Sequence, residues 1–530
     1  MVSRTARNSL KLSAMTMISR VLGLVRDHYQ AVFFGTGPIA AFWEIAYMLP
    51  NMLRNLLAEG VLSQSFIPIY SQAMKESDRK AAETAGSIIG FLILFLSGIV
   101  LTGILVFPFF LPVYVGKSLG EIGLLLYLSQ VLFGFILAVS LTAIFSGIAQ
   151  THEYFVFPSL SPILLNLSFI AGFLVLLPFG FNQELNAEIL AWVVLGGGFL
   201  QLFVQIGYTY YKGWMPRIHI NLKDPALRRI FSLMGPAVLG ASVFQLNQMM
   251  DIALASYFID EAGAIPALRF AHRLIQLPTG IIGVALSTTI LPALAGLIRS
   301  GENHRSASEV VEAVGFALFL TVPAAFGFLF LGPWIIHLLF HGGEWTLYST
   351  YLTWSALQFY ALAIPIYSFN KILTSSFYAY QDTKTPVKIL FLTVAVNLAC
   401  NLVLIGPLKQ GGLALSTAIS STVNFLLLNR ALKKKMGALP YADLGRSLLR
   451  LAPAILLLLG LLLGLSYFMP YPMTDVPDAS LHADLPYSKA VLVVGLGAGL
   501  GAVLYLVTAH LTGAAQMRII SDMLRRRFGK

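Results

Sequence analysis

The chain has 530 residues, of which 57% are hydrophobic and 11% are charged, and its formal net charge is +11. Soluble domains carry roughly 25% charged residues, so this composition excludes a soluble globular protein and indicates a polytopic membrane protein. The single cysteine, Cys400, excludes a disulfide framework. The sequence also lacks a nucleotide-binding loop, a zinc-ligand spacing and a nucleophile elbow, so we expect a transporter and not an enzyme.

Apolar stretches of about 20 residues predict an all-α fold with fourteen transmembrane helices. The second and eighth stretches are long and have a proline near both ends, so we expect them to be kinked or irregular. The predicted spans are 12–34, 38–70, 84–114, 121–149, 155–180, 186–211, 229–258, 264–298, 306–340, 350–379, 385–405, 411–429, 447–469 and 488–511.

The remaining cations predict the orientation of these helices. Of the 29 Lys and Arg residues outside the apolar segments, 26 fall on the side of the N-terminus and three on the other side, Lys117, Lys409 and Lys489. The positive-inside rule therefore puts both termini in the cytoplasm. The net charge follows from this topology and from contact with anionic lipid head groups, so we expect no nucleic acid partner.

Two short sequence matches predict an internal duplication. Residues 62–68 resemble residues 286–292, and Gln150 with Asn166 resembles Gln381 with Asn397, 231 residues later. We therefore expect two pseudo-symmetric six-helix lobes, 1–222 and 223–432, followed by two further helices and a basic tail in 433–530. Parallel repeats of this kind are a transporter architecture, with the substrate site between the lobes.

Six cations lie inside apolar segments, where each costs about 2.5–3.5 kcal/mol at the bilayer centre. We interpret them as the lining of a wet chamber that binds an anion. They are Arg20, Arg26, Arg54, Arg269, Arg273 and Lys371.

Asp27 follows Arg26 and leaves two interpretations open. On a straight helix Arg20 and Asp27 share a face and Arg26 points about 120° away, so both arginines reach one cavity only if the helix bends, for which Gly23 is a plausible place. The alternative is a structural Arg26–Asp27 pair, with Arg20 extending to the interface.

Proline and a pair of like charges mark two further positions. Pro50 opens the second helix one turn before Arg54, whose alternative role is a local bridge to Glu44 or Glu59. Arg269 and Arg273 stand four residues apart on one face, where like charges repel unless an anion or water lies between them.

A separate oxygen-rich set consists of Asp251, Asn397, Asn401 and Thr417. Oxygen ligands of this kind suit a hard cation such as Na⁺. Interhelical hydrogen bonds between polar side chains in lipid are an equally good interpretation.

These residues resemble the peptidoglycan lipid II flippase family (MurJ, formerly MviN) of the multidrug/oligosaccharidyl-lipid/polysaccharide exporter superfamily. The resemblance covers nearly the whole chain and rests on motifs in residues 15–27, 49–60, 63–68, 273–278 and 381–387. Two positions depart from the family pattern, because Ala41 and Gln276 stand where relatives carry acidic residues. A carboxylate is also expected at the position of Asn401.

The resemblance implies flipping of undecaprenyl-diphosphate-linked muropeptide (lipid II) from the inner to the outer leaflet of the bacterial inner membrane by alternating access. It also implies a monomer that contacts membrane lipids, with no cofactor other than a possible Na⁺ at Asp251, Asn397, Asn401 and Thr417. The alternatives are a flippase for another polyprenyl-diphosphate oligosaccharide and, less favoured by the cationic residues, a cation-coupled drug antiporter. The substrate-binding residues expected on this basis are Arg20, Arg26, Asp27, Asn51, Arg54, Glu59 and Arg273.

Overall fold

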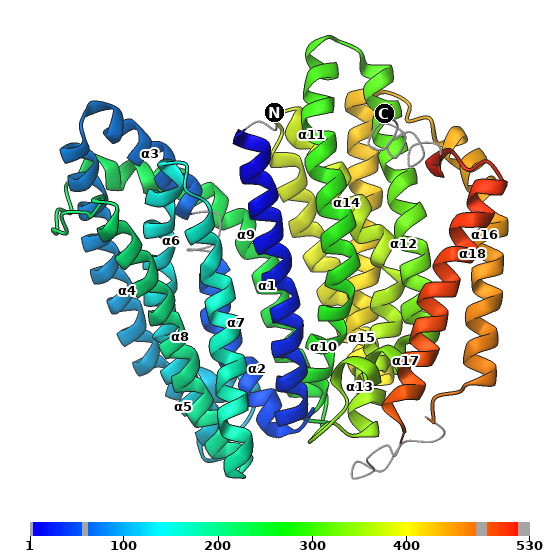
Figure 1. The fold of residues 1–530 in the computed structure, drawn as a ribbon, viewed down its shortest axis with the longest axis horizontal. Coiled ribbons are helices and arrows are strands. Elements are labelled where there is room, and N and C mark those ends of the chain that lie inside the picture. The colour runs from blue at the N-terminus through cyan, green and yellow to red at the C-terminus, as the bar shows by residue number, and fades with distance from the viewer. Residues whose placement is uncertain (1–3, 56–61, 473–484, 518–530) are drawn as a thin grey trace. The chain divides into compact units, whose positions relative to one another are not determined.

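The computed structural model describes residues 4–55, 62–472 and 485–517. Apart from an isolated β-bridge between Gly342 and Trp345, regular secondary structure in these ranges is helical, as predicted. The contacts divide the chain into two compact units, Met1–Tyr257 (unit 1) and Phe258–Lys530 (unit 2). Figure 1 labels the helices of both units.

Unit 1 is built from nine α-helices and two short 3₁₀ turns among its described residues. They are α1 (Arg4–Phe34), α2 (Pro38–Leu53), α3 (Ser63–Glu76), α4 (Asp78–Val115), η2 (Leu119–Ile122), α5 (Gly123–Phe133), α6 (Phe135–Thr151), α7 (Val156–Leu176), η3 (Leu177–Phe179), α8 (Gln183–Tyr211) and α9 (Pro225–Phe258). Buried aromatic side chains form much of its core, including Trp43, Phe66, Phe135 and Phe169.

Unit 2 is built from nine α-helices and two short π-helical segments among its described residues. Its elements are α10 (Ala264–Pro278), η4 (Thr279–Gly283), α11 (Val284–Arg299), α12 (Asn303–Phe340), α13 (Leu347–Leu362), α14 (Ile364–Ala379), α15 (Lys384–Met436), α16 (Tyr441–Phe468), α17 (Tyr487–Gly495), η5 (Leu496–Leu500) and α18 (Gly501–Leu511). Within α15, Lys409 has a non-helical conformation (φ 48°, ψ −129°), and it separates the two predicted spans 385–405 and 411–429.

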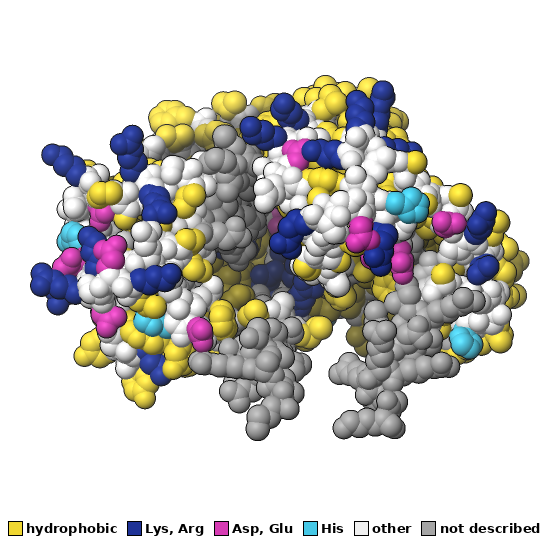
Figure 2. Space-filling model, turned by 90° about the horizontal axis from the view of Figure 1, so that it is seen from above, with side chains coloured by type: hydrophobic (Ala, Val, Ile, Leu, Met, Phe, Trp, Pro, Cys, Tyr) yellow, Lys and Arg dark blue, Asp and Glu magenta, His cyan; other side chains and the backbone are white. Residues whose placement is uncertain are grey.

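Nine helices or helix pairs in the described ranges are long and apolar enough to cross a membrane. The chain is therefore a multi-pass membrane protein, while the count of fourteen crossings stays a prediction. Figure 2 looks onto the upper helix ends of Figure 1, and Lys and Arg side chains are spread widely over that face. The nine are 78–115, 119–151, 156–179, 183–211, 264–299, 303–340, 384–436, 441–468 and 487–511.

The expected irregularity of the second and eighth segments is confirmed. The helix α2 contains Pro50 and gives way to a π-type turn at Arg54 and Asn55, before α3 begins at Ser63. In unit 2, α10 ends at Pro278 and a π-helical segment, Thr279–Gly283, precedes α11. Because proline lacks a backbone donor, it weakens the helix at both positions.

One turn has the same geometry in both units. The N–H of Tyr154 donates to the Ala149 carbonyl at 2.9 Å, and the N–H of Asp382 donates to the Phe377 carbonyl at 3.0 Å. The residues before them, Glu153 and Gln381, both have positive φ (64° and 57°). These turns lie 228 residues apart, so the sequence match of Gln150 with Gln381 is three residues out of register.

The connection between α8 and α9 lies against α4. The N–H of Arg217 donates to the Ala82 carbonyl at 3.0 Å, and the N–H of His219 donates to the Gly86 carbonyl at 3.4 Å. A Cβ at Gly86 would stand 1.7 Å from the Arg217 carbonyl oxygen, and one at Gly90 would stand 2.3 Å from that of His219. Only glycine therefore lets the two backbones approach this closely.

Candidate functional site

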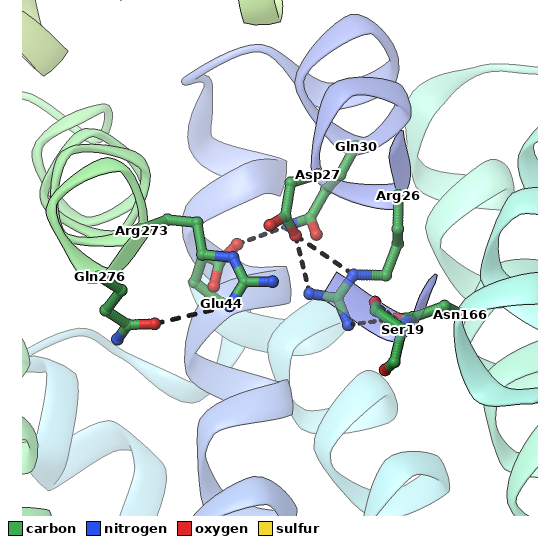
Figure 3. Close-up of polar contacts among 8 residues, drawn as sticks. All are labelled: Ser19, Arg26, Asp27, Gln30, Glu44, Asn166, Arg273 and Gln276. Carbon is green, nitrogen blue, oxygen red and sulfur yellow. Dashed lines mark hydrogen bonds and ion pairs between the residues drawn. The ribbon is translucent and has the colours of Figure 1, made fainter. Parts of the chain in front are cut away.

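Asp27, the most buried charged residue in the described part of unit 1, forms an ion pair with Arg26 on α1. The carboxylate Oδ1 of Asp27 accepts from Arg26 Nη2 at 2.7 Å and from Arg26 Nε at 3.2 Å. The Asp27 side chain is 0% exposed and that of Arg26 is 13% exposed. Figure 3 shows the Arg26 guanidinium turned toward this carboxylate. The structural pair predicted as one alternative is therefore present, and it neutralises most of the Arg26 charge.

Helix α7 fixes the orientation of the Arg26 guanidinium. The Asn166 amide oxygen accepts from Arg26 Nη1 at 3.3 Å, and the Asn166 amide nitrogen donates to the Ser19 carbonyl at 3.0 Å. The guanidinium carbon also lies 5.2 Å from the centre of the Phe169 ring. Asn166 thus joins α7 to two successive turns of α1, a role that the sequence match at Asn166 did not reveal.

A second buried polar contact joins α1 to α2. Gln30 Nε2 donates to Glu44 Oε1 at 2.5 Å, and the two residues are 2% and 6% exposed. The sequence analysis named Glu44 as an alternative partner of Arg54 but gave no signal for Gln30. Burying Glu44 beside an amide and close to α1 adds a second carboxylate to the polar interior of unit 1.

The remaining site residues predicted in unit 1 lie on the same two helices. Arg20 is half-buried on α1, and α1 is a single α-helix through Gly23, the position named above as a plausible place for a bend. Arg54 caps α2, and both Arg54 and Asn51 are half-buried. Glu59 falls outside the described residues.

In unit 2, α10 carries a polar row. Arg273 Nη1 lies 3.5 Å from Gln276 Oε1, and Gln276 Nε2 lies 3.1 Å from His272 Nδ1. Figure 3 shows the Arg273 and Gln276 side chains extending from this helix. The Arg269 guanidinium carbon lies 5.7 Å from the Phe270 ring centre. Because Gln276 is uncharged, its contact does not neutralise Arg273.

The sixth cation has a structural contact that the sequence did not predict. Lys371 on α14 donates from Nζ to the Thr279 carbonyl at 3.1 Å. Thr279 begins the π-helical segment between α10 and α11. An ammonium group there satisfies a carbonyl at the point where the regular hydrogen-bond ladder changes, so Lys371 stabilises the break.

The oxygen-rich set is divided between the units. Asn397 and Asn401 are 1% and 0% exposed in unit 2, and Asn401 Nδ2 donates to Asn397 Oδ1 at 3.0 Å. Asn397 Nδ2 lies 3.4 Å from Thr417 Oγ1. Asp251 belongs to unit 1, where its Oδ2 lies 3.5 Å from Asn247 Nδ2. The unit 2 amides are arranged as an interhelical hydrogen-bond network, and this arrangement does not fit a bare cation unless the amides turn.

Asp382 and Glu261 lie outside the predicted membrane spans, and each forms an ion pair with a lysine. Asp382 Oδ2 lies 2.8 Å from Lys435 Nζ, and its two oxygens also accept from the backbone and hydroxyl of Thr385. The contact with Lys435, followed by the Thr385 hydrogen bonds, lowers the pKa of Asp382. In the loop before α10, the hydrogen bond from Lys409 lowers the pKa of Glu261.

A family model described as lipid II flippase MurJ matches residues 30–477. The chain belongs to this family. The match extends from α1 in unit 1 to beyond α16 in unit 2, so it covers both helix breaks. It also covers four of the six cations considered above, and Arg20 and Arg26 lie before it.

Relatives with curated names support this membership. The chain is 33% identical over 432 residues to a probable lipid II flippase MurJ of Rickettsia prowazekii, covering 80% of this chain and 82% of the relative. It is 32% identical over 472 residues to one of Buchnera aphidicola from Schizaphis graminum, covering 88% and 90%. It is 30% identical over 464 residues to the lipid II flippase MurJ of Burkholderia cenocepacia, covering 86% and 89%.

Solved structures show the same fold. A lipid II flippase MurJ in an inward closed conformation is similar with a TM-score of 0.75 at 24% identity, covering 98% of this chain and 99% of that one. An inward-facing multidrug resistance transporter of the MATE family, in the MOP superfamily, is similar with a TM-score of 0.67 at 13% identity, covering 81% and 100%. At these identities the likeness concerns the fold alone.

Proposed function

We propose that this chain is a flippase that moves lipid II from the inner to the outer leaflet of the bacterial inner membrane. The observation that carries the proposal is membership of the MurJ family over residues 30–477, together with guanidinium groups on helices of a multi-pass membrane protein. Both termini lie in the cytoplasm in this proposal, and the protein acts as a monomer. The chemistry is binding and movement, without an enzymatic step.

Arginine side chains bind the lipid diphosphate in this mechanism. A guanidinium donates in a fork that matches phosphate oxygens, and such charge-assisted hydrogen bonds are stronger than neutral ones. Arg26 already uses Nε and Nη2 on Asp27, so its contribution is a positioned partial charge. We assign the fuller share to Arg20, Arg54 and Arg273. Asn51 and Glu59 of the second segment stay predicted substrate-binding residues, and Glu59 lies outside the described residues.

The broken helices supply the moving parts. The π-type turn after α2 and the π-helical segment before α11 change the hydrogen-bond pattern at the end of α2 and between α10 and α11. Helix interruptions of this kind act as hinges. We infer that alternating access uses these two breaks and that Lys371 holds the second one through the Thr279 carbonyl.

The membrane potential supports outward movement of an anionic lipid. An inside-negative potential favours that movement by about 2.3 kcal/mol per elementary charge per 100 mV. A diphosphate of charge near −2 therefore gains about 4–5 kcal/mol on the same scale. Sodium coupling through Asp251, Asn397, Asn401 and Thr417 stays a prediction, and no step above depends on it.

The direct test is lipid II flipping by the purified full chain in liposomes. We expect wild type to flip lipid II and Arg273→Gln to lose at least ten-fold in rate. Arg299→Gln is the matched control, because Arg299 lies in the same unit and donates only to its own helix, at the Ala295 carbonyl, in its described hydrogen bond. Equal flipping by wild type and Arg273→Gln would place the anion site elsewhere.

The same liposomes separate the alternative cargo. If another polyprenyl-diphosphate oligosaccharide is the substrate, it will be flipped faster than lipid II and will compete with it. A drug antiporter would instead exchange organic cations and leave lipid II in place. Replacing Na⁺ by K⁺ on both sides tests the sodium prediction, because a coupled protein slows without Na⁺.

A further inference from the structure

A cavity of about 360 Å³ lies within unit 1, between α4, α6 and the first half of α9. Phe91 and Phe95 from α4 face Phe231 and Met234 from α9, and Ser140 from α6 contributes to the lining. All of the lining residues other than Ser140 are apolar. The cavity is separate from the arginines and amides described above, none of which lines it.

The mouth of this cavity meets the surface that faces lipid. Phe95 and Phe231 line the cavity and are still 42% and 43% exposed. Further along α4, Leu101 and Leu105 are 63% and 70% exposed on a helix that is long and apolar enough to span a membrane. Hydrocarbon therefore reaches the opening. Ser140 is the one polar side chain in the lining, fewer than the two to four polar partners that a buried water needs.

The length and volume of the cavity match one lipid chain. Along α9 its lining runs from Leu227 to Val238, which is about 16 Å of helix at 1.5 Å per residue. That is about half of a 30 Å hydrocarbon core, which is the reach of one leaflet. Since an apolar cavity of about 150 Å³ takes a benzene molecule, one of about 360 Å³ holds roughly fourteen carbons.

Basic residues flank the end of the cavity where α9 begins. Arg228 and Arg229 are exposed and follow Leu227 directly, and Arg229 Nη1 donates to Gln72 Oε1 of α3 at 2.7 Å. Cations next to an apolar slot at a helix start are complementary to a lipid phosphate above its acyl chain. A hydrocarbon chain without an anionic head group would make no electrostatic contact with these arginines.

We propose that the cavity binds one acyl chain of a phospholipid from the leaflet at the start of α9, with the phosphate against Arg228. The bound chain buries apolar surface between α4 and α9, so it stabilises the packing of α9 within unit 1. This proposal does not rest on lipid II being the transported lipid.

Gly235 offers a way to fill the cavity without a clash. It lines the cavity, and a Cβ built there has nothing within 4 Å. Gly235→Phe therefore projects a ring into the space that the chain would occupy. Gly98→Phe is the matched control, because Gly98 on α4 is equally open and does not line the cavity.

The experiment measures thermal unfolding of the delipidated full chain in detergent as phosphatidylglycerol of increasing chain length is added. We expect Tm to rise with chain length up to about fourteen carbons and then to level, in wild type and Gly98→Phe alike. Gly235→Phe should have a higher Tm without lipid and should lose most of the lipid-induced rise. An unchanged rise in Gly235→Phe would overturn the proposal.

A second measurement identifies the occupant and does not need a cavity-filling variant to fold. A photo-crosslinking residue at Phe231 should form an adduct in cells whose added mass is that of a phospholipid. An adduct with the mass of a polyprenyl diphosphate, or no lipid adduct at all, would contradict the phospholipid assignment.

Discussion

The two units differ in how they hold positive charge. In unit 1, Arg26 is fixed by the buried carboxylate of Asp27 and by the amide of Asn166. In unit 2, Arg273 lies beside the uncharged amide of Gln276, and Lys371 donates to a backbone carbonyl. The contact described for Arg26 is an ion pair, whereas the one described for Arg273 is a hydrogen bond to an uncharged amide. The difference teaches that burial of a cation does not by itself identify a ligand.

The turns that follow α6 and α14 repeat this contrast outside the apolar segments. Both place a residue of positive φ before the next helix. In unit 2 the following residue, Asp382, pairs with Lys435, while in unit 1 the following residue, Tyr154, has Lys212 Nζ 4.8 Å above its ring. The unit 2 turn therefore has an ion pair in addition to a cation–π contact of Lys435 with Tyr380, whereas the contact described for Lys212 is cation–π.

The largest effect is expected when the Arg26–Asp27 pair is broken. Removing one partner of a buried ion pair leaves an uncompensated charge and costs about 3–5 kcal/mol. We expect Asp27→Asn to lower the free energy of unfolding in detergent by this amount. The double variant Arg26→Gln with Asp27→Asn should recover most of the loss. If the loss in the double variant equals the sum of the losses in Arg26→Gln and Asp27→Asn, the two side chains do not stabilise each other.

The next largest effect concerns transport and not stability. A charge-assisted hydrogen bond contributes about 1.5–3 kcal/mol, which is roughly a ten- to hundred-fold change in rate. Arg273→Gln should lose this much in lipid II flipping while its Tm stays close to wild type. Arg273→Lys should keep part of the rate, since the charge remains. A large drop in Tm would instead assign Arg273 a structural role like that of Arg26.

A smaller effect is expected at the turn of unit 2. Asp382→Asn removes the ion pair with Lys435 and weakens the cap on Thr385, so the free energy of unfolding should fall by about 1–2 kcal/mol at pH 7. Because the folded pKa of Asp382 is lowered, its contribution is present above the ordinary value of about 3.9 and is lost as pH falls through the folded pKa.

The pH profile is the control for that variant. Unfolding of wild type and Asp382→Asn should differ at pH 7, and the difference should shrink below about pH 4. A difference that stays constant down to pH 3 would show that the carboxylate charge is not the source.

The smallest effect is expected at the matching turn of unit 1. An exposed cation–π contact contributes about 0.5–1 kcal/mol. Lys212→Gln should lower the free energy of unfolding by no more than this. The difference between wild type and Lys212→Gln should be the same at pH 4 and at pH 8. A loss as large as that of Asp382→Asn would remove the proposed contrast between the two turns.

The sequence predicts the fold well because hydropathy and proline act locally. Apolar runs located the helices, and Pro50 and Pro278 located the two breaks. The turn geometry pairs Gln381 with Glu153, three residues from Gln150, because Gln150 is helical whereas Gln381 has positive φ. Register in such a turn depends on φ, which residue identity alone does not specify.

The candidate site was predicted less completely. The sequence offered the Arg26–Asp27 pair as one alternative, because the two residues are adjacent in the chain. It could not predict Asn166 as the bridge from α7 to Ser19, or Gln30 as the donor to Glu44. These contacts join residues 147 and 14 positions apart, and they depend on helix packing that no short motif encodes. Lys371 was identified as buried, but its carbonyl partner exists only because the helix changes to π geometry.

The glycine pair on α4 has a consequence for how the protein tolerates change in length. The carbonyls of Arg217 and His219 pack directly against Gly86 and Gly90, so the position of residues 217–219 along α4 is fixed. Residues inserted directly after Lys212 should form a longer loop and leave these contacts with α4 unchanged. One residue inserted between Arg217 and His219 would shift the chain so that the two carbonyls no longer face Gly86 and Gly90 together. The packing of this connection against α4 would then be lost.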